Sequence, residues 1–139
     1  MSGESDLHII LKTLKPALNA GEYVFCHTAD LHQIPIEDIF CLFREKEAIT
    51  VILPRAVADR LNLSYSFVSA WITLTVHSSL ESVGLTAAFS KALAEKGISC
   101  NVVAAFYHDH IFVPVKDASK TMQVLEAVSK SEKKQNSGL

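Results

Sequence analysis

The sequence predicts an α+β fold in which two small modules each pack helices on one face of an antiparallel sheet. Three observations in the second half of the chain lead to this prediction. Side chains of two kinds alternate over residues 70–77, which is the period of a strand with two different faces. Apolar residues then recur at helical spacing over residues 85–93. The stretches 98–107 and 110–115 follow and predict two paired strands.

Single residues mark where these elements are expected to end. Gly97 stands where a left-handed C-terminal helix cap is expected. His108 and Asp109 form the predicted tight turn between the two paired strands. Asp117 can cap a last amphipathic helix, and the polar tail 131–139 is expected to be frayed. The second half therefore has the order strand, helix, strand, strand, helix.

The first half of the chain predicts a similar but less regular module. Residues 22–27 are rich in β-branched and aromatic side chains and predict a strand. Residues 38–44 and 48–53 predict a hairpin, because a short charged stretch separates two apolar runs. Pro54 is then suited to open a short helix over residues 55–61.

The second half lacks the last strand that a four-stranded, ferredoxin-like sheet requires. An unpaired sheet edge invites association, so another segment is expected to cover it. The apolar N-terminal segment 6–14 is by its own pattern ambiguous between strand and helix, and we predict that it inserts there as the missing strand. The expected organisation is an N-terminal module over residues 1–66, a C-terminal module over 67–130 and a flexible tail over 131–139, with the strands of the two modules interlocked.

Composition excludes several classes of function. The chain has 139 residues, 49% of them hydrophobic and 20% charged, with a net charge of −2. This charge lacks the basic footprint that nucleic-acid binding requires, and no apolar run is long enough for a membrane helix. The N-terminus has no signal-peptide pattern. The three widely spaced cysteines, Cys26, Cys41 and Cys100, support neither a zinc ribbon nor a disulfide framework. We therefore expect a cytoplasmic protein.

The serine-rich loop before the helix at 85–93 is the predicted ligand site. A serine there can cap the helix, and the unpaired N–H groups of its first turn point toward an anion. The absence of a side chain at Gly84 lets a carboxylate approach, while Glu81 can accept an ammonium group. The pattern therefore suits a free amino acid. The residues assigned to this loop are Ser79, Glu81, Ser82, Val83, Gly84 and Leu85.

A second part of the predicted site lies on the strand that follows. Asn101 shares a strand face with Val103 and Ala105, and small side chains there admit a ligand or a second sheet. We assign Asn101, Val102 and Val103 of a neighbouring module to the ligand site. The alternatives at both places stay open, namely that the serine is only a helix cap and that the strand face is ordinary packing.

With these elements laid out, the stretch AWITLTVHSSLESVGLTAAFSKALAEKGISCNVVAAFYHDHIFVPV resembles the ACT domain, a βαββαβ regulatory module. The opening, DLHIILKTL…GEYVFCHT…FCLFREKEAITVILP, is similar to the first module of tandem ACT proteins. The likeness is to the ACT pairs of aspartate kinases and of cytosolic arginine sensors, and most closely to a bacterial family of stand-alone ACT-repeat proteins without assigned function.

The resemblance implies that a small effector lies between two modules. The corresponding positions here are 78–86, in the loop and the helix start, and 101–105 on the facing strand. It also implies side-by-side association, which agrees with the exposed sheet edges that the sequence predicts. No kinase or dehydrogenase domain is joined to these modules in this sequence, so the output is expected to pass to another protein.

Metal binding and catalysis are the alternatives with less support. His77, His108 and His110 suggest a metal site, but histidines two residues apart across a turn rarely converge on one ion. Motifs of hydrolases, zinc proteases and P-loop enzymes do not occur, and the five glycines never cluster. We therefore expect neither an enzyme nor a bound metal or cofactor.

The function predicted from the sequence is a regulatory ACT protein that binds a small molecule, most simply an amino acid. Binding is expected to shift the association of a homodimer or of a complex with another protein. The alternative is a ligand-free module that docks a partner protein through its sheet edges or faces. Neither reading involves nucleic acid or a membrane.

Overall fold

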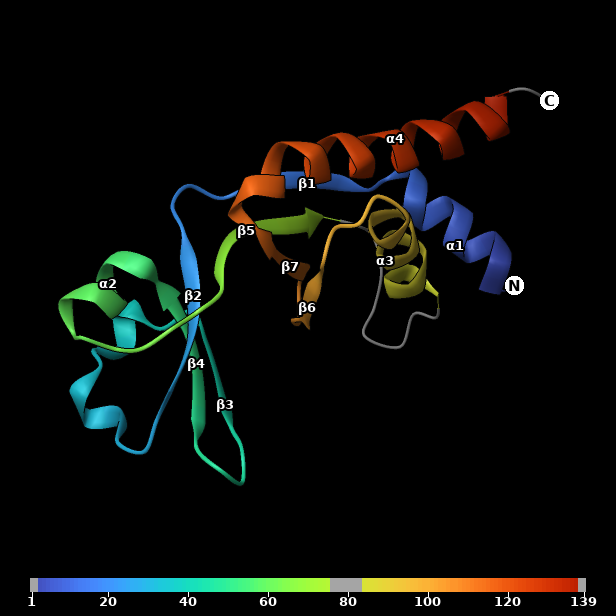
Figure 1. The fold of residues 1–139 in the computed structure, drawn as a ribbon. Helices are drawn as coiled ribbons and strands as arrows, with labels where there is room; N and C mark the ends of the chain where they lie inside the picture. The colour runs from blue at the N-terminus through green and yellow to red at the C-terminus, as the bar shows by residue number, and fades with distance from the viewer. Residues whose placement is uncertain (1–2, 76–83, 138–139) are drawn as a thin grey trace. The chain divides into compact units, whose positions relative to one another are not determined.

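The computed structural model describes residues 3–75 and 84–137 of the chain. These residues form two compact units (Figure 1), one made of residues 20–70 and the other of residues 1–19 together with 71–139. The second unit therefore combines both ends of the chain. In the described ranges, no helix is long and apolar enough to cross a membrane.

The unit of residues 20–70 is a four-stranded sheet with one short helix. Its strands are β2 (Tyr23–Thr28), β3 (Cys41–Arg44), β4 (Ile49–Pro54) and the start of β5 (Val68–Thr75), with helix α2 (Arg55–Arg60) after β4 and 3-10 turns at Leu31–Gln33 and Ile36–Asp38. The strand order is β3-β4-β2-β5, and each of these pairings is antiparallel. The predicted strands at 22–27 and 48–53 and the helix after Pro54 are confirmed.

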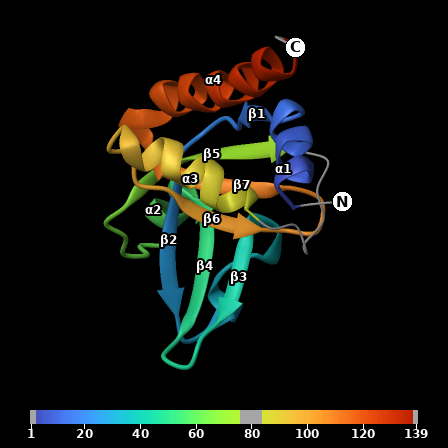
Figure 2. The same ribbon diagram turned by 90° about the vertical axis from the view of Figure 1, so that its right-hand side faces the viewer.

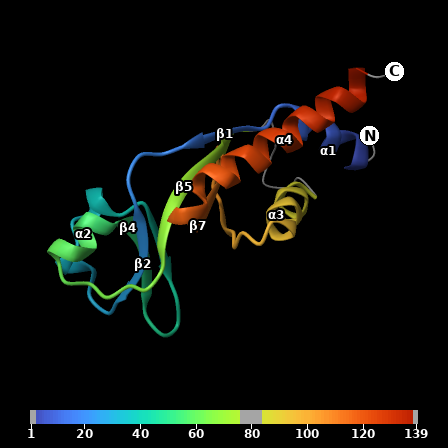
Figure 3. The ribbon, with the colours of Figure 1, turned by 45° about the horizontal axis from the view of Figure 1, so that its top comes forward.

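Helix α2 covers one face of this sheet, as Figure 3 shows beside β2 and β4. Alternation places Val24 and Cys26 of β2 on the same face as Val51 and Leu53 of β4, and all four side chains are buried. Val57 of α2 packs into the same cluster. The sheet and the helix thus close a small apolar core inside this unit.

The other unit is built around the rest of β5 (Figures 1 and 2). Its elements are helix α1 (Gly3–Lys12), β1 (Lys15–Leu18), α3 (Leu85–Glu95), β6 (Asn101–Ala104), β7 (Asp109–Pro114), a 3-10 turn at Val115–Asp117 and α4 (Ala118–Ser137). The strand order is β1-β5-β7-β6. A strand from the N-terminal end of the chain therefore fills the edge that the sequence of the second half left open.

The segment that fills this edge differs from the one expected. Residues 6–14 were predicted as the inserted strand, but the structure forms helix α1 over Gly3–Lys12, and β1 at Lys15–Leu18 pairs antiparallel with β5. The spacing of the buried apolar residues explains why a helix forms. Leu11 and Leu14 follow Ile10 by one and four residues, which places all three on one side of a helical turn. Pro16 fits in β1 because an edge strand tolerates a missing N–H donor.

Helices α1, α3 and α4 contact one another, and α4 runs along β1. Among the described residues, the large apolar side chains that are fully buried in this unit come from four elements. They are Ile72 and Leu74 of β5, Phe89 and Leu93 of α3, Ile111 and Val113 of β7, and Leu125 of α4. The periodic pattern at 85–93 and the α+β class are therefore confirmed.

Three further expectations differ from the structure. The strand expected over 98–107 is limited to Asn101–Ala104, and the turn lies at Phe106 and Tyr107 rather than at His108 and Asp109. The N–H of Ala105 donates to the carbonyl of His108 and closes this turn. The tail expected to be frayed continues α4 as far as Ser137.

Candidate functional site

The structure describes only the last part of the predicted ligand loop. Gly84 stands at the N-cap of α3 with φ 91° and ψ −14°, a left-handed conformation that favours glycine. Its carbonyl accepts the first helical hydrogen bond, from the N–H of Ala88 at 3.0 Å, and Leu85 is buried. Outside the described residues lie Ser79, Glu81, Ser82 and Val83.

The open side of Gly84 faces a side chain of the protein itself. A Cβ added at Gly84 would come within 3.3 Å of Leu7 Cδ2, from helix α1. A ligand carboxylate was expected to use this space. In the structure the missing side chain instead allows α1 to approach the start of α3 closely.

The second part of the predicted site lies on strand β6. Asn101 is exposed, and its Nδ2 donates to the carbonyl of Phe112 at 3.3 Å, while Val102 and Val103 are half-buried. The register pairs Asn101 with Phe112 and Val103 with His110, so these four side chains share one sheet face. The structure thus brings Gly84 together with Leu7, and brings Asn101 and Val103 together with residues of β7.

His110 is the centre of a polar cluster on that same face. Trp71 Nε1 donates to His110 Nδ1 at 3.0 Å, and Thr73 Oγ1 lies 3.2 Å from the same nitrogen. Asn19 Nδ2, next to the end of β1, donates to Thr73 Oγ1 at 2.9 Å. Because the indole N–H can only donate, Nδ1 must accept, which assigns the neutral Nε2–H tautomer to His110.

The surroundings of His110 favour this neutral form. Burial lowers the pKa of His110, the neighbouring His108 lowers it further, and Asp109 acts in the opposite direction. Burial also raises the pKa of Asp109. His108 Nδ1 is buried and has no hydrogen-bond partner among the residues that the structure describes. Across the described ranges, no three histidine, cysteine or acidic side chains come together to hold a metal ion.

We expect the free energy of unfolding to fall as the pH drops below about 6.5, the unperturbed pKa of histidine. In that range the unfolded chain takes up a proton on His110 before the folded chain does, so the folded state loses relative stability until the lowered pKa is passed. The contribution of Asp109 has the opposite sign, because its folded-state pKa lies above the ordinary 3.8; it builds up as the pH falls and is complete near pH 3.8. Urea denaturation from about pH 8 to about pH 5 measures the slope.

The control for this pH dependence is His110→Asn, because an asparagine Oδ1 can accept the Trp71 hydrogen bond and does not titrate. The variant should be folded and should show a smaller slope below about pH 6.5. A slope equal to that of the unaltered protein would contradict the role given to His110.

Cys26 and Cys100 are not placed for nucleophilic chemistry. Burial raises the pKa of the Cys100 thiol to about 11 and also raises that of Cys26. The thiolate is the reactive form, so both thiols stay protonated and unreactive at neutral pH.

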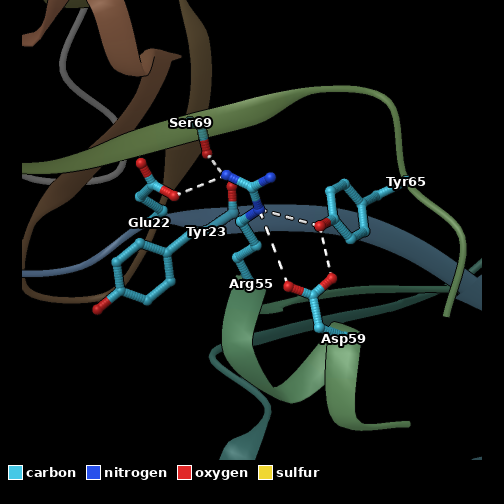
Figure 4. A network of polar contacts seen from close by, with 6 residues as sticks. All are labelled: Glu22, Tyr23, Arg55, Asp59, Tyr65 and Ser69. Carbon is cyan, nitrogen blue, oxygen red and sulfur yellow. Dashed lines mark hydrogen bonds and ion pairs between the residues drawn. The ribbon is translucent and has the colours of Figure 1, made fainter. Parts of the chain in front are cut away.

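A separate polar network lies in the unit of residues 20–70 (Figure 4). Arg55 Nε donates to the Tyr65 hydroxyl at 2.9 Å, and Arg55 Nη1 donates to Glu22 Oε1 at 3.0 Å. The Tyr65 hydroxyl donates in turn to Asp59 Oδ1 at 2.6 Å. These hydrogen bonds, from Tyr65 first and Glu22 second, raise the pKa of Arg55. The N–H of Arg55 also donates to the carbonyl of Glu22.

Sequence reasoning did not single out either network. The alternation over 70–77 places Trp71 and Thr73 on one strand face, but Asn19 joins them only because β1 pairs with β5. Glu22 and Tyr65 are 33 and 10 residues from Arg55 in the sequence. Knowledge of the register between β1 and β5 would have been needed to predict the cluster around His110. No local sequence pattern predicts the network around Arg55.

Comparison with known proteins agrees with this architecture. Family models described as ACT domain match residues 2–70 and residues 66–127. The first match includes α1 and β1, which the structure places in the same unit as residues 71–139. The two repeats of the sequence are thus not the same as the two compact units. Among curated proteins, none matches the sequence.

Several solved structures share the fold. A Vibrio cholerae protein of unknown function, described as a possible transport protein, is 42% identical, with 92% of this chain and 99% of that chain covered and a TM-score of 0.80. A protein from Agrobacterium tumefaciens is 18% identical, covering 84% and 89%, with a TM-score of 0.63. Escherichia coli aspartokinase III in complex with aspartate and ADP is 13% identical, covering 83% and 32%, with a TM-score of 0.56.

Proposed function

The chain belongs to the ACT domain family, and we propose that it is a regulatory protein in which binding of a free amino acid changes its association with a second copy. ACT domains generally bind amino acids for regulation. The aspartokinase III structure, of which this chain covers 32%, is a complex with aspartate and ADP. The proposal assigns the protein to the cytoplasm and gives it no catalytic step and no cofactor.

The proposed ligand site joins two copies of the chain. One copy supplies the loop that leads into α3, from Ser79 to Leu85, and the other supplies Asn101–Val103 of β6. The observation that supports this arrangement is the position of β6, which ends the strand order β1-β5-β7-β6. Within the described residues its outer edge has no strand beside it, and such an edge is suited to pair with another sheet.

A thermal-shift screen of the common amino acids tests the proposal. A ligand that binds only the folded protein stabilises it by about 2.7 kcal/mol at a hundredfold excess over its dissociation constant. The variants Glu81→Ala and Asn101→Ala should weaken the response to that ligand. If no amino acid shifts the transition at millimolar concentration, the protein does not act as an amino-acid sensor.

Association through β6 gives a separate prediction. Ala104 is exposed at the end of β6, and Ala104→Lys should shift the protein toward the monomer, because a lysine on an edge strand opposes edge-to-edge pairing. The matched control is Ala94→Lys on the exposed side of α3. Sedimentation or light scattering measures the mass. Equal masses for both variants and the unaltered protein would place the contact elsewhere.

The second candidate is a ligand-free interaction module. Two observations favour it, namely the Leu7 side chain against Gly84 and the aromatic pair Phe106 and Tyr107, which are 79% and 80% exposed at the β6–β7 turn. In this case Glu81→Ala leaves association with a partner protein unchanged, and no amino acid alters it. Phe106→Ser would weaken that association instead.

A further inference from the structure

A cavity of about 480 Å³ lies at one end of the unit of residues 20–70, at the start of β2 and the end of β4. Its lining combines small residues, a tyrosine and charged side chains. The lining consists of Ala20, Gly21, Glu22, Tyr23, Pro54, Arg55, Ala56 and Asp59. The volume is within the range of small-molecule sites.

The charged groups of this cavity form one hydrogen-bonded network, with Arg55, Glu22 and Asp59 each between 43% and 59% exposed. Glu22 and Tyr65 each make a hydrogen bond to Arg55, and Tyr65 also donates to Asp59 Oδ1 (Figure 4). The guanidinium lies over the Tyr65 ring, 5.7 Å from its centroid. The guanidinium is thus bonded directly to Glu22 and is linked to Asp59 through the Tyr65 hydroxyl.

The cavity has more negative charge than Arg55 neutralises. Glu22 and Asp59 carry two negative charges against the one positive charge of Arg55. In the described part of the chain, Glu22 Oε2 has no hydrogen-bond partner, and Asp59 Oδ2 has only a 4.0 Å ion-pair contact with Arg55 Nε. Two carboxylate oxygens therefore remain to accept hydrogen bonds from a ligand. An ammonium group supplies three donors and the missing positive charge.

We infer that this cavity binds a small primary amine with a net positive charge, held by Glu22 and Asp59. The ligand's ammonium group donates to the two carboxylates, which the network around Arg55 links. An anion is disfavoured because it would meet an excess of negative charge. The site is separate from the loop of the proposed function, since all its residues come from the unit of residues 20–70.

The experiment is a titration of the ¹⁵N-labelled full chain, followed through the backbone amide signals of Gly21 and Ala56. Three related probes are used, namely L-lysine, cadaverine, which lacks the carboxylate, and L-norleucine, which lacks the side-chain ammonium. We expect saturable shifts with lysine and cadaverine, and binding of norleucine weaker by about tenfold or more, the loss expected for one charged hydrogen bond. Added salt should weaken the binding of both amines.

Variants separate this site from a purely structural ion-pair network. Glu22→Gln and Asp59→Asn should each weaken binding of cadaverine by about tenfold or more. The matched control is Asp38→Asn, which removes a carboxylate from the Arg60 ion pair in the same unit but outside the cavity. It should leave binding unchanged.

The inference is overturned if neither amine gives saturable shifts at Gly21 and Ala56, if norleucine binds as well as lysine, or if the two cavity variants bind cadaverine like the control. Urea denaturation of each variant shows that it is folded before it is titrated. Failure here leaves the proposed function untouched, because Glu81→Ala and Asn101→Ala test a different site, made of the loop before α3 and strand β6.

Discussion

Leu14→Ala should lower the free energy of unfolding by about 2–5 kcal/mol, the range for a leucine removed from a close-packed core. Leu14 is only 2% exposed and lies between α1 and β1. Its N–H donates to the carbonyl of Leu11 and ends the helical turn. The loss should appear in urea denaturation as a lower midpoint with an unchanged slope.

Leu18→Ala is the matched control, because Leu18 has the same side chain, is four residues away in β1 and is 50% exposed. Its replacement should change the free energy of unfolding by less than about 0.5 kcal/mol. A large loss at Leu14 and a small one at Leu18 would show that the N-terminal segment is part of the core built by residues 71–139. Equal small losses would mean that α1 and β1 are not packed as described.

The elements that could be predicted from the sequence are those in which apolar residues recur with a clear period. β5 and α3 follow directly from the alternation over 70–77 and the helical spacing over 85–93, because in both elements one face is buried. Helix α1 could have been recognised from the spacing of Ile10, Leu11 and Leu14. The prediction of a strand over residues 6–14 failed because the sheet edge is filled by the next segment, β1 at Lys15–Leu18.

The turn between β6 and β7 was misplaced for a chemical reason. Polar residues are the usual turn signal, so His108 and Asp109 were preferred over the aromatic pair before them. In the structure the side chains of Phe106 and Tyr107 are exposed and contact each other edge to face, with ring centroids 5.0 Å apart. Their exposure is one of the observations that favour the second candidate function, a module that docks a partner protein.

The candidate sites depend on contacts that local sequence cannot supply. His110 meets Trp71 and Thr73 across neighbouring strands, and Arg55 meets Glu22 because β4 ends beside the start of β2. Such pairs need the register of the sheet, which a single sequence does not give. The residue types of the predicted ligand loop were recognisable, but the Leu7 side chain at Gly84 comes from a helix that was expected to be a strand.

Gly84→Ala should be the more costly of two matched glycine substitutions, and the comparison separates backbone strain from contact with α1. Gly84 and Gly97 flank α3 with φ of 91° and 72°, so alanine at either position incurs about 1–2 kcal/mol of left-handed strain. A Cβ at Gly97 meets nothing within 4 Å, whereas at Gly84 it meets Leu7 Cδ2 at 3.3 Å. The loss at Gly84 should therefore exceed the loss at Gly97.

The double variant Leu7→Ala with Gly84→Ala completes the test. If α1 packs on this glycine, the cost of Gly84→Ala in the Leu7→Ala background should fall to that of Gly97→Ala, since only strain remains. Equal costs at the two glycines in the unaltered background would mean that the space beside Gly84 is open. That result would restore the original role of Gly84 as the point where a ligand's carboxylate approaches the start of α3, and would favour the sensor over the ligand-free module.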